Sequence, residues 1–358
     1  MTPLELLCLF LFGKLERRTE SKLFQHFNTV LSWDALLNGN VQTDLAPLLF
    51  HIVKENQDRL DMHIPDFVYD RLKELNRRYA VIYLAQAHAK KSIFSIFSDY
   101  DIDFIPLKGA ALAEDLYPDA FMRPLGDIDL LIRKTDINKA VHILDNNGYQ
   151  PYKETRNKIA LAQQDSIFHL TYCKTIFSVP IIIELHYAMA RKVFVRDNIF
   201  GFWDDAMHDS CKQHLYHVSV ETQLYYLCWH FFQHIANNLS FRFIWLIDIA
   251  LLLKKHYQTI DWNILNNKIR TRDKLIRIKV PFFIVAELFN LDFHIPSNLK
   301  PSNWEKALFN MTFQRYGQTR YPKLCALPLN IINPYFLLAR TYLHIKARTL
   351  IYSSSARQ

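Results

Sequence analysis

Glycine is scarce in this sequence, with 7 residues among 358. The tight hairpin turns of β-rich proteins depend on glycine, because it adopts left-handed backbone conformations without strain. The scarcity therefore argues against an all-β protein and favours long helices with few hairpins. Half of the residues are hydrophobic and 14% are aromatic, so the chain has enough apolar surface to bury a large core.

Closely spaced cysteine pairs are also missing. The five cysteines are odd in number and form no Cys-x-x-Cys motif, which excludes a disulfide framework and a cysteine-rich zinc site. The apolar stretch from Leu6 to Phe12 follows Glu5, where a signal peptide would carry positive charge. No stretch reaches the roughly 18 uncharged apolar residues that a membrane span needs. We therefore expect a cytoplasmic protein without a membrane span.

Long basic runs are absent as well, although the formal net charge is +8. An excess of this size suits a polyanionic partner, either a nucleic acid or the triphosphate of a nucleotide. It suits equally a protein whose surplus lysines are solvated, because no run of five or more basic residues occurs.

The apolar periodicity changes twice along the chain. Spacings of three and four residues dominate the first hundred positions and predict helices, including a long one over 66–99. Short apolar runs then predict strands at 104–107, 127–132, 167–172 and 180–186, with helices at 110–116 and 136–147. Helical spacing returns at 221–236, 243–256, 262–271, 274–290, 304–316 and 335–352.

These patterns predict an α+β chain with three parts. Residues 1–102 are expected to form an N-terminal helical region. Residues 103–190 form a core of strands and helices. Residues 191–358 form a C-terminal helical domain, which we expect to make the second wall of a cleft.

Two aspartates on one predicted strand are the most informative feature. Residues i and i+2 of a strand point to the same face, so Asp127 and Asp129 direct two carboxylates to one place while Ile128 and Leu130 face the core. Carboxylates so close repel each other unless a cation lies between them. Such oxygen ligands hold magnesium together with substrate phosphates, and a pair of such ions promotes phosphoryl transfer.

A third carboxylate lies in an otherwise apolar strand. Glu184 stands within the segment 181–187, where a carboxylate without a partner would be costly to bury. A place beside the two aspartates, as a metal ligand or as the base for an acceptor, explains it best. His186 shares the face of Glu184 by the same alternation. It either positions an acceptor or is a hydrogen-bonded core histidine.

The residues that carry a family resemblance follow one order along the chain: Lys108-Gly109, Arg123, Asp127-Ile-Asp129 and Glu184-Leu-His186. This order resembles the uncharacterised nucleotidyltransferase family of the polymerase-β-like superfamily, clearly over 104–187 and more weakly over the helices that follow. The resemblance implies transfer of a nucleoside monophosphate from a nucleoside triphosphate (NTP) with a divalent metal, Mg²⁺ or Mn²⁺. It implies that Asp127 and Asp129 bind metal, that Glu184 is the third acid, and that Gly109 opens a turn contacting the triphosphate.

Two departures from the superfamily pattern concern the phosphates. Ala110 follows Gly109 where the superfamily usually has serine or glycine, and the spacing from Gly109 to Asp127 is longer than usual. Lys108 is expected to compensate as a positive charge beside the turn. Arg123 either binds phosphate or lies on the surface and pairs with Asp119.

Polar residues near and beyond the core form a candidate acceptor pocket: His186, His230, His234, Arg242 and Asp248. Asp248 is the only charged side chain in the segment 243–253, so it should be buried and paired with Arg242 or with one of the two helical histidines. His230 and His234 have the i, i+4 spacing of zinc ligands, but no third ligand accompanies them. We expect pocket or core histidines.

The sequence therefore predicts an NTP-dependent, two-metal nucleotidyltransferase acting on an unidentified acceptor, which is a small molecule, a peptide or RNA. An alternative is a nucleotidyltransferase fold that has lost catalysis and serves as a binding or scaffold protein. A third interpretation, an enzyme that modifies tRNA, fits the positive net charge. Metal-dependent NTP binding distinguishes the enzyme from the scaffold.

Overall fold

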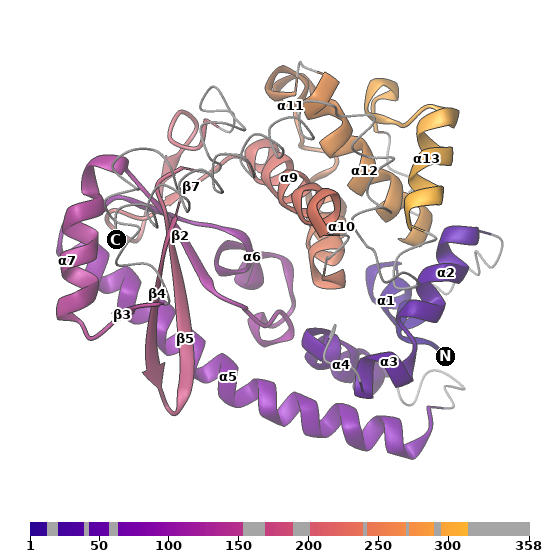
Figure 1. Ribbon diagram of the computed structural model, residues 1–358, viewed down its shortest axis with the longest axis horizontal. Helices are drawn as coiled ribbons and strands as arrows, with labels where there is room; N and C mark the ends of the chain where they lie inside the picture. The colour runs from indigo at the N-terminus through magenta and orange to yellow at the C-terminus, as the bar shows by residue number, and fades with distance from the viewer. Residues whose placement is uncertain are drawn as a thin grey trace, which may run out of the picture.

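A computed structural model describes residues 1–12, 21–38, 43–56, 64–152, 169–188, 201–238, 242–269, 272–289 and 295–313. In these parts of the chain, helices surround a mixed five-stranded sheet, and a separate two-stranded sheet lies beside it (Figure 1). This mixture of helices and sheet agrees with the expected α+β class. No helix in these ranges is both long enough and apolar enough to cross a membrane.

The central sheet has the strand order β1-β2-β5-β4-β3. Its strands are β1 (Phe104–Pro106), β2 (Ile128–Ile132), β3 (Gln150–Pro151), β4 (His169–Ile176) and β5 (Val179–His186). β2 and β5 run parallel, whereas the other neighbouring strands are antiparallel. In the parallel pair Asp129 lies opposite Glu184, and Leu131 lies opposite His186. The polar residues of two strands distant in sequence are thus brought side by side.

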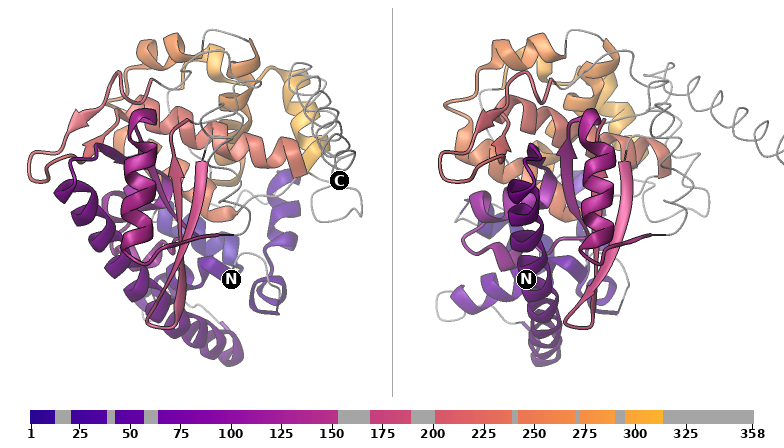
Figure 2. Two further views of the ribbon diagram at one scale, coloured as in Figure 1. Left: turned by 60° about the vertical axis from the view of Figure 1, so that its left-hand side comes forward. Right: turned by 90° about the vertical axis from the view of Figure 1, so that its left-hand side faces the viewer.

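One face of the sheet packs against α5 (Asp66–Asp99) and α7 (Ile137–Asn146). Ile128, Leu130 and Ile132 point to this face and join the apolar side chains of both helices in one buried cluster. Alternation along β2 therefore sends its remaining side chains to the opposite face. Figure 2 shows α7 lying in front of the strands.

Helix α5 connects this cluster to the rest of the molecule. Its predicted range, 66–99, is confirmed. The apolar residues of its first half pack with α4 (Ala46–Asn56) in the larger buried cluster of the protein. Those of its second half recur at four-residue spacing and lie under the sheet: Ala85, Ala89, Ile93 and Phe97. Figure 1 shows this course from the N-terminal helices to the sheet.

The other face of the sheet meets α6 (Lys108–Leu116), α9 (Val220–Asn238) and α10 (Phe243–His256). Further helices of the same buried cluster are α1 (Pro3–Phe12), α2 (Lys22–Val30), α3 (Trp33–Asn38), α11 (Trp262–Lys268), α12 (Arg272–Phe289) and α13 (Asn303–Phe313). The N-terminal and C-terminal helices touch directly, as in the edge-to-face contact of Phe27 with Phe243 at 5.4 Å between ring centroids. The domain boundaries at 102 and 190 stay predictions.

The differences from the predicted elements are local. β2 begins at Ile128 rather than at Asp127, and the strand predicted to end at 172 continues to Ile176. Two short strands, β6 (Met207–His208) and β7 (Tyr216–His217), pair where no strand was predicted, because two residues carry no periodic signal. The predicted helix at 335–352 lies outside the described residues.

Candidate functional site

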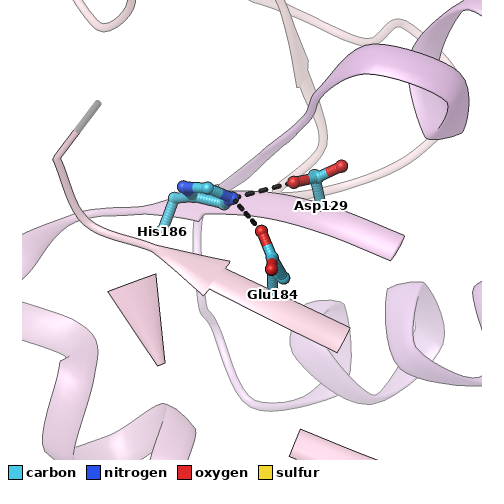
Figure 3. Close-up of side chains that lie close together, drawn as sticks. All are labelled: Asp129, Glu184 and His186. Carbon is cyan, nitrogen blue, oxygen red and sulfur yellow. Dashed lines mark hydrogen bonds and ion pairs between the residues drawn. The ribbon is translucent and has the colours of Figure 1, made fainter. Parts of the chain in front are cut away.

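The side chains of Asp129, Glu184 and His186 meet on the face of the sheet that packs against α6, α9 and α10. The donor atoms of Asp129, Glu184 and His186 all lie within 4.8 Å of one another. Nε2 of His186 lies 2.8 Å from Oδ1 of Asp129 and 3.4 Å from Oε2 of Glu184. Figure 3 shows the imidazole reaching both carboxylates. The parallel register of β2 and β5 explains this meeting, since it sets Asp129 directly opposite Glu184.

Asp127 lies just before β2 and is coupled to the same acids. Burial and the negative charge of Asp129 raise the pKa of Asp127 to about 7, with a further contribution from Glu184, while Lys108 acts in the opposite direction. Like charges that share a buried place disfavour ionisation in this way. The carboxyl groups of Asp127 and Asp129 therefore lie close enough to interact where β2 begins.

Lys108 is the cation in direct contact with these acids. Its Nζ donates a hydrogen bond of 2.7 Å to Oδ1 of Asp129. Although burial disfavours the ammonium ion, the charges of Asp129, Tyr226, Asp127 and Glu184 hold the pKa of Lys108 above its usual value. Lys108 begins α6 with a φ of 47°, a left-handed conformation that costs a non-glycine residue about 1–2 kcal/mol.

His186 is buried. Together with Lys108 it contacts Oδ1 of Asp129 and balances the negative charge of that carboxylate. Burial opposes ionisation of Asp129, but Lys108 and the hydrogen bond from His186 keep the pKa of Asp129 well below its usual range. Burial also lowers the pKa of His186, yet its hydrogen bonds to Asp129 and Glu184 outweigh burial and raise it. The arrangement favours an ionised aspartate beside a protonated imidazole.

A buried ion pair lies behind the turn that carries Lys108. Nη2 of Arg123 donates to Oδ2 of Asp248 at 2.6 Å, and Nε donates to Oδ1 at 3.2 Å. The Tyr117 hydroxyl donates to the same Oδ1 at 2.8 Å. The side chains of Arg123 and Asp248 are 4% and 0% exposed.

These contacts correct two expectations. Asp248 is buried as predicted, but the predicted partner, either Arg242 or one of the two helical histidines, is wrong. The alternative of a surface Arg123 paired with Asp119 is also wrong. The physical reason is that the loop between α6 and β2 folds over α10 and brings Arg123 to Asp248.

Gly109 lets this loop approach α6 closely. A Cβ at Gly109 would lie 2.8 Å from Cζ of Arg123 and 2.6 Å from Cδ2 of Leu125, closer than real Cβ contacts allow. Only a residue without a side chain fits here. The predicted contact between the Gly109 turn and a triphosphate remains a prediction.

Arg242, the residue before α10, pairs with Asp44 of the short helix η1 (Thr43–Leu45). Its Nε donates a hydrogen bond of 3.0 Å to Oδ2 of Asp44, and Nη2 lies 2.9 Å from the same oxygen in an ion pair. A Cβ at Gly126 would lie 3.0 Å from Nη1 of Arg242. The guanidinium group is thus adjacent to the residue that precedes Asp127.

One face of α9 carries three further side chains near the acids. Tyr226, His230 and His234 follow one another at four-residue spacing and so share this face. The charges of Lys108 and Asp129 act on the pKa values of Tyr226 and His230, and those of Lys108 and Glu184 act on that of His234. These three residues therefore lie on the same side of the sheet as the acids.

The two histidines of α9 are neutral at pH 7. Burial, reinforced by the positive charge of Lys108, lowers the pKa of His230 well below its usual value and that of His234 to about 4. Their rings contact Trp245 of α10 at 4.7 and 4.6 Å between centroids. Among the described residues, the group of three possible metal ligands is made by Asp129, Glu184 and His186 and does not include these two histidines.

Two residues near the acids were not predicted. His169 of β4 lies opposite His186, with ring centroids 5.3 Å apart, and burial together with His186 lowers its pKa to about 4. Its sequence surroundings give no signal of this position. Tyr226 belongs to an aromatic run that indicates helix packing, but its four-residue spacing from His230 is a signal that could have identified it.

A comparison with known protein families shows which family the chain belongs to. The family described as uncharacterised nucleotidyltransferase matches residues 29–285, which include the sheet and helices on both sides of it. The chain therefore belongs to this family. No curated protein and no solved structure gives a significant match.

Proposed function

We propose that this member of the uncharacterised nucleotidyltransferase family transfers a nucleoside monophosphate from an NTP to an acceptor hydroxyl or amine and releases pyrophosphate. One observation carries the proposal: donor atoms of Asp129, Glu184 and His186 lie within 4.8 Å of one another on adjacent parallel strands, with Asp127 beside them. Convergent carboxylates of this kind are what divalent-metal phosphoryl transfer requires.

A divalent cation fits the chemistry of these side chains. Burial and the charge of Asp129 raise the pKa of Asp127 to about 7, and a cation bound beside this carboxylate would favour its ionised form. Asp127, Asp129 and Glu184 would hold Mg²⁺ or Mn²⁺, because both ions suit carboxylate oxygens. His186, which contacts Asp129 and Glu184 through Nε2, would position these two carboxylates. The metal would supply Lewis acidity toward the phosphate oxygens.

Glu184 and His186 serve the acceptor in this proposal. The acceptor oxygen or nitrogen attacks the α-phosphorus, the bond from that phosphorus to the bridging oxygen breaks, and pyrophosphate leaves. Burial raises the pKa of Glu184, but the hydrogen bond from His186 lowers it below the usual value. Glu184 is therefore ionised at pH 7, the state needed to receive the acceptor proton.

In this proposal α6 and α9 have different roles around the acids. The first turn of α6 offers backbone N–H groups and the Lys108 ammonium to phosphate oxygens. His230 and His234 are neutral, so they form hydrogen bonds with an acceptor without adding positive charge. Lys108 and Gly109 are thus assigned to the triphosphate, and the α9 histidines to the acceptor.

Calorimetric titration of NTPs with and without Mn²⁺ tests the proposal. Metal-dependent binding is expected in the natural protein and is expected to be lost in Asp129→Asn. Mass spectrometry of cell extracts incubated with the protein and an NTP would then detect the acceptor by the mass of one added nucleoside monophosphate. Binding without any such product in extracts would favour the non-catalytic binding protein. No metal-dependent binding of any NTP would refute both readings of the site.

A further inference from the structure

Cations from different elements lie near the segments that carry the acids: Lys108 contacts Asp129, Arg123 lies beside Gly109, and Arg242 lies beside Gly126. Lys108 is 14% exposed and holds Asp129. Arg123 is 4% exposed, and each of its guanidinium nitrogens donates to a buried acceptor, two to Asp248 and Nη1 to the Pro124 carbonyl at 3.1 Å. A ligand could recruit Arg123 only by breaking this buried pair, which is costly.

Arg242 differs from the other two in orientation and exposure. Its side chain is 34% exposed. Nε and Nη2 face Asp44, so the remaining nitrogen, Nη1, is turned from Asp44 toward Gly126. A guanidinium group held on one edge presents its other edge in a fixed direction, which is how arginine recognises phosphate.

Gly126 keeps the approach between Arg242 and Asp127 open. It is exposed, and a Cβ there would lie 3.0 Å from Nη1 of Arg242. The loop that contains Gly126 is fixed to α5, because Nε2 of Gln86 donates a hydrogen bond of 2.7 Å to the Leu125 carbonyl. An anion bound at Asp127 through a metal would therefore find Arg242 beside it, across a residue without a side chain.

Asp44 has the features of a residue that orients a ligand-binding arginine. It is 4% exposed, and its Oδ2 contacts both Nε and Nη2 of Arg242. The neighbouring Thr43 hydroxyl lies 3.0 Å from the Tyr79 hydroxyl, which connects η1 to α5. Asp44 thus connects η1 and α5 to the Arg242 side chain, which lies beside Gly126.

We propose that Arg242 binds the triphosphate of the substrate and that Asp44 positions Arg242 for that contact. The inference rests on the proposed function, because it takes the ligand of Asp127 and Asp129 to be a metal-bound triphosphate. It assigns to Arg242 the phosphate contact that the sequence suggested for Arg123. It also makes the N-terminal helical region part of the nucleotide site.

Binding of inorganic tripolyphosphate in the presence of Mn²⁺, measured by calorimetry, tests the role of Arg242 without depending on the base. Arg242→Gln is expected to weaken binding roughly tenfold to a hundredfold, since it removes charge-assisted hydrogen bonds. Arg242→Lys keeps the charge but not the fork and should recover only part of the affinity. The matched control is Lys255→Gln in α10, the helix that follows Arg242; Lys255 pairs with Asp115, which is 50% exposed, and this variant should bind tripolyphosphate as the natural protein does.

A double-mutant cycle tests the positioning role of Asp44. Asp44→Asn should weaken tripolyphosphate binding several-fold in the natural background and should have no further effect in the Arg242→Gln background. A purely structural Asp44 would lower the melting temperature in both backgrounds and leave the affinity unchanged, which would overturn its positioning role.

The outcomes separate this inference from the proposed function. Affinity of Arg242→Gln within twofold of the natural protein, together with lost binding in Asp129→Asn, would overturn the role of Arg242 and leave the nucleotidyltransferase proposal standing. No binding of tripolyphosphate or of any NTP by the natural protein would overturn both. Circular dichroism of each variant checks that the fold is retained.

Discussion

Removing Asp248 should destabilise the protein more than most single substitutions. Its carboxylate accepts two hydrogen bonds from Arg123 and one from Tyr117, and the side chain is 0% exposed. Asp248→Ala leaves the guanidinium group of Arg123 buried without its counter-charge. It also leaves the Tyr117 hydroxyl without its acceptor.

The size of the effect follows from these lost partners. Breaking a buried ion pair by removing one member costs about 3–5 kcal/mol, because the remaining charge stays desolvated. Domains are typically stable by about 5–15 kcal/mol, so Asp248→Ala should take away a large share of the free energy of unfolding. Replacing both partners by apolar residues, as in Arg123→Met with Asp248→Leu, should cost much less, because no charge is then left buried.

Urea denaturation followed by circular dichroism measures these differences. The matched control is Asp115→Ala, which removes the exposed partner of Lys255 and should change the free energy of unfolding by at most about 1 kcal/mol. A loss below about 1 kcal/mol in Asp248→Ala would refute the reasoning from burial. So would a double variant as unstable as the single one, since the cost would then not come from an unpaired Arg123.

Three further predictions concern the acids and the lysine. Asp127 has a pKa of about 7 in the folded protein against 3.8 ordinarily, so its carboxyl group contributes stability that is present below about pH 4 and is lost as pH rises to about 7. Because the lowered pKa values of His169, His230 and His234 act in the opposite direction over this range, the test is the difference in melting temperature between the natural protein and Asp127→Asn, which should fall with rising pH; a pH-independent difference would contradict the shift. Glu184→Gln should lower kcat far more than it weakens NTP binding, because its contact matters mainly in the transition state. An unchanged kcat with a lowered melting temperature would make Glu184 structural. Lys108→Ala should weaken NTP binding about tenfold or more in calorimetry, and equal affinity would remove Lys108 from the triphosphate site.

Local patterns were sufficient to predict the main helices and the central strands. The limits of α5 and α10 follow from apolar spacing over many residues, which a helix must satisfy along its whole length. The burial of Asp248 also follows from its apolar neighbours. The convergence of Asp129 with Glu184 could be expected only because both lie in apolar strands and in a familiar order along the chain.

The partners of the charged residues were decided by the tertiary structure. Asp248 meets Arg123, which precedes it by 125 residues, and Arg242 meets Asp44, which precedes it by 198. The sequence offered Arg242 or a neighbouring histidine for Asp248, because those lie nearest along the chain. Periodicity records which face of an element is buried, but it carries no information about which distant element covers that face. Ion pairs between distant segments are therefore fixed by packing, and here packing encloses Arg123 and leaves Arg242 partly exposed beside Gly126.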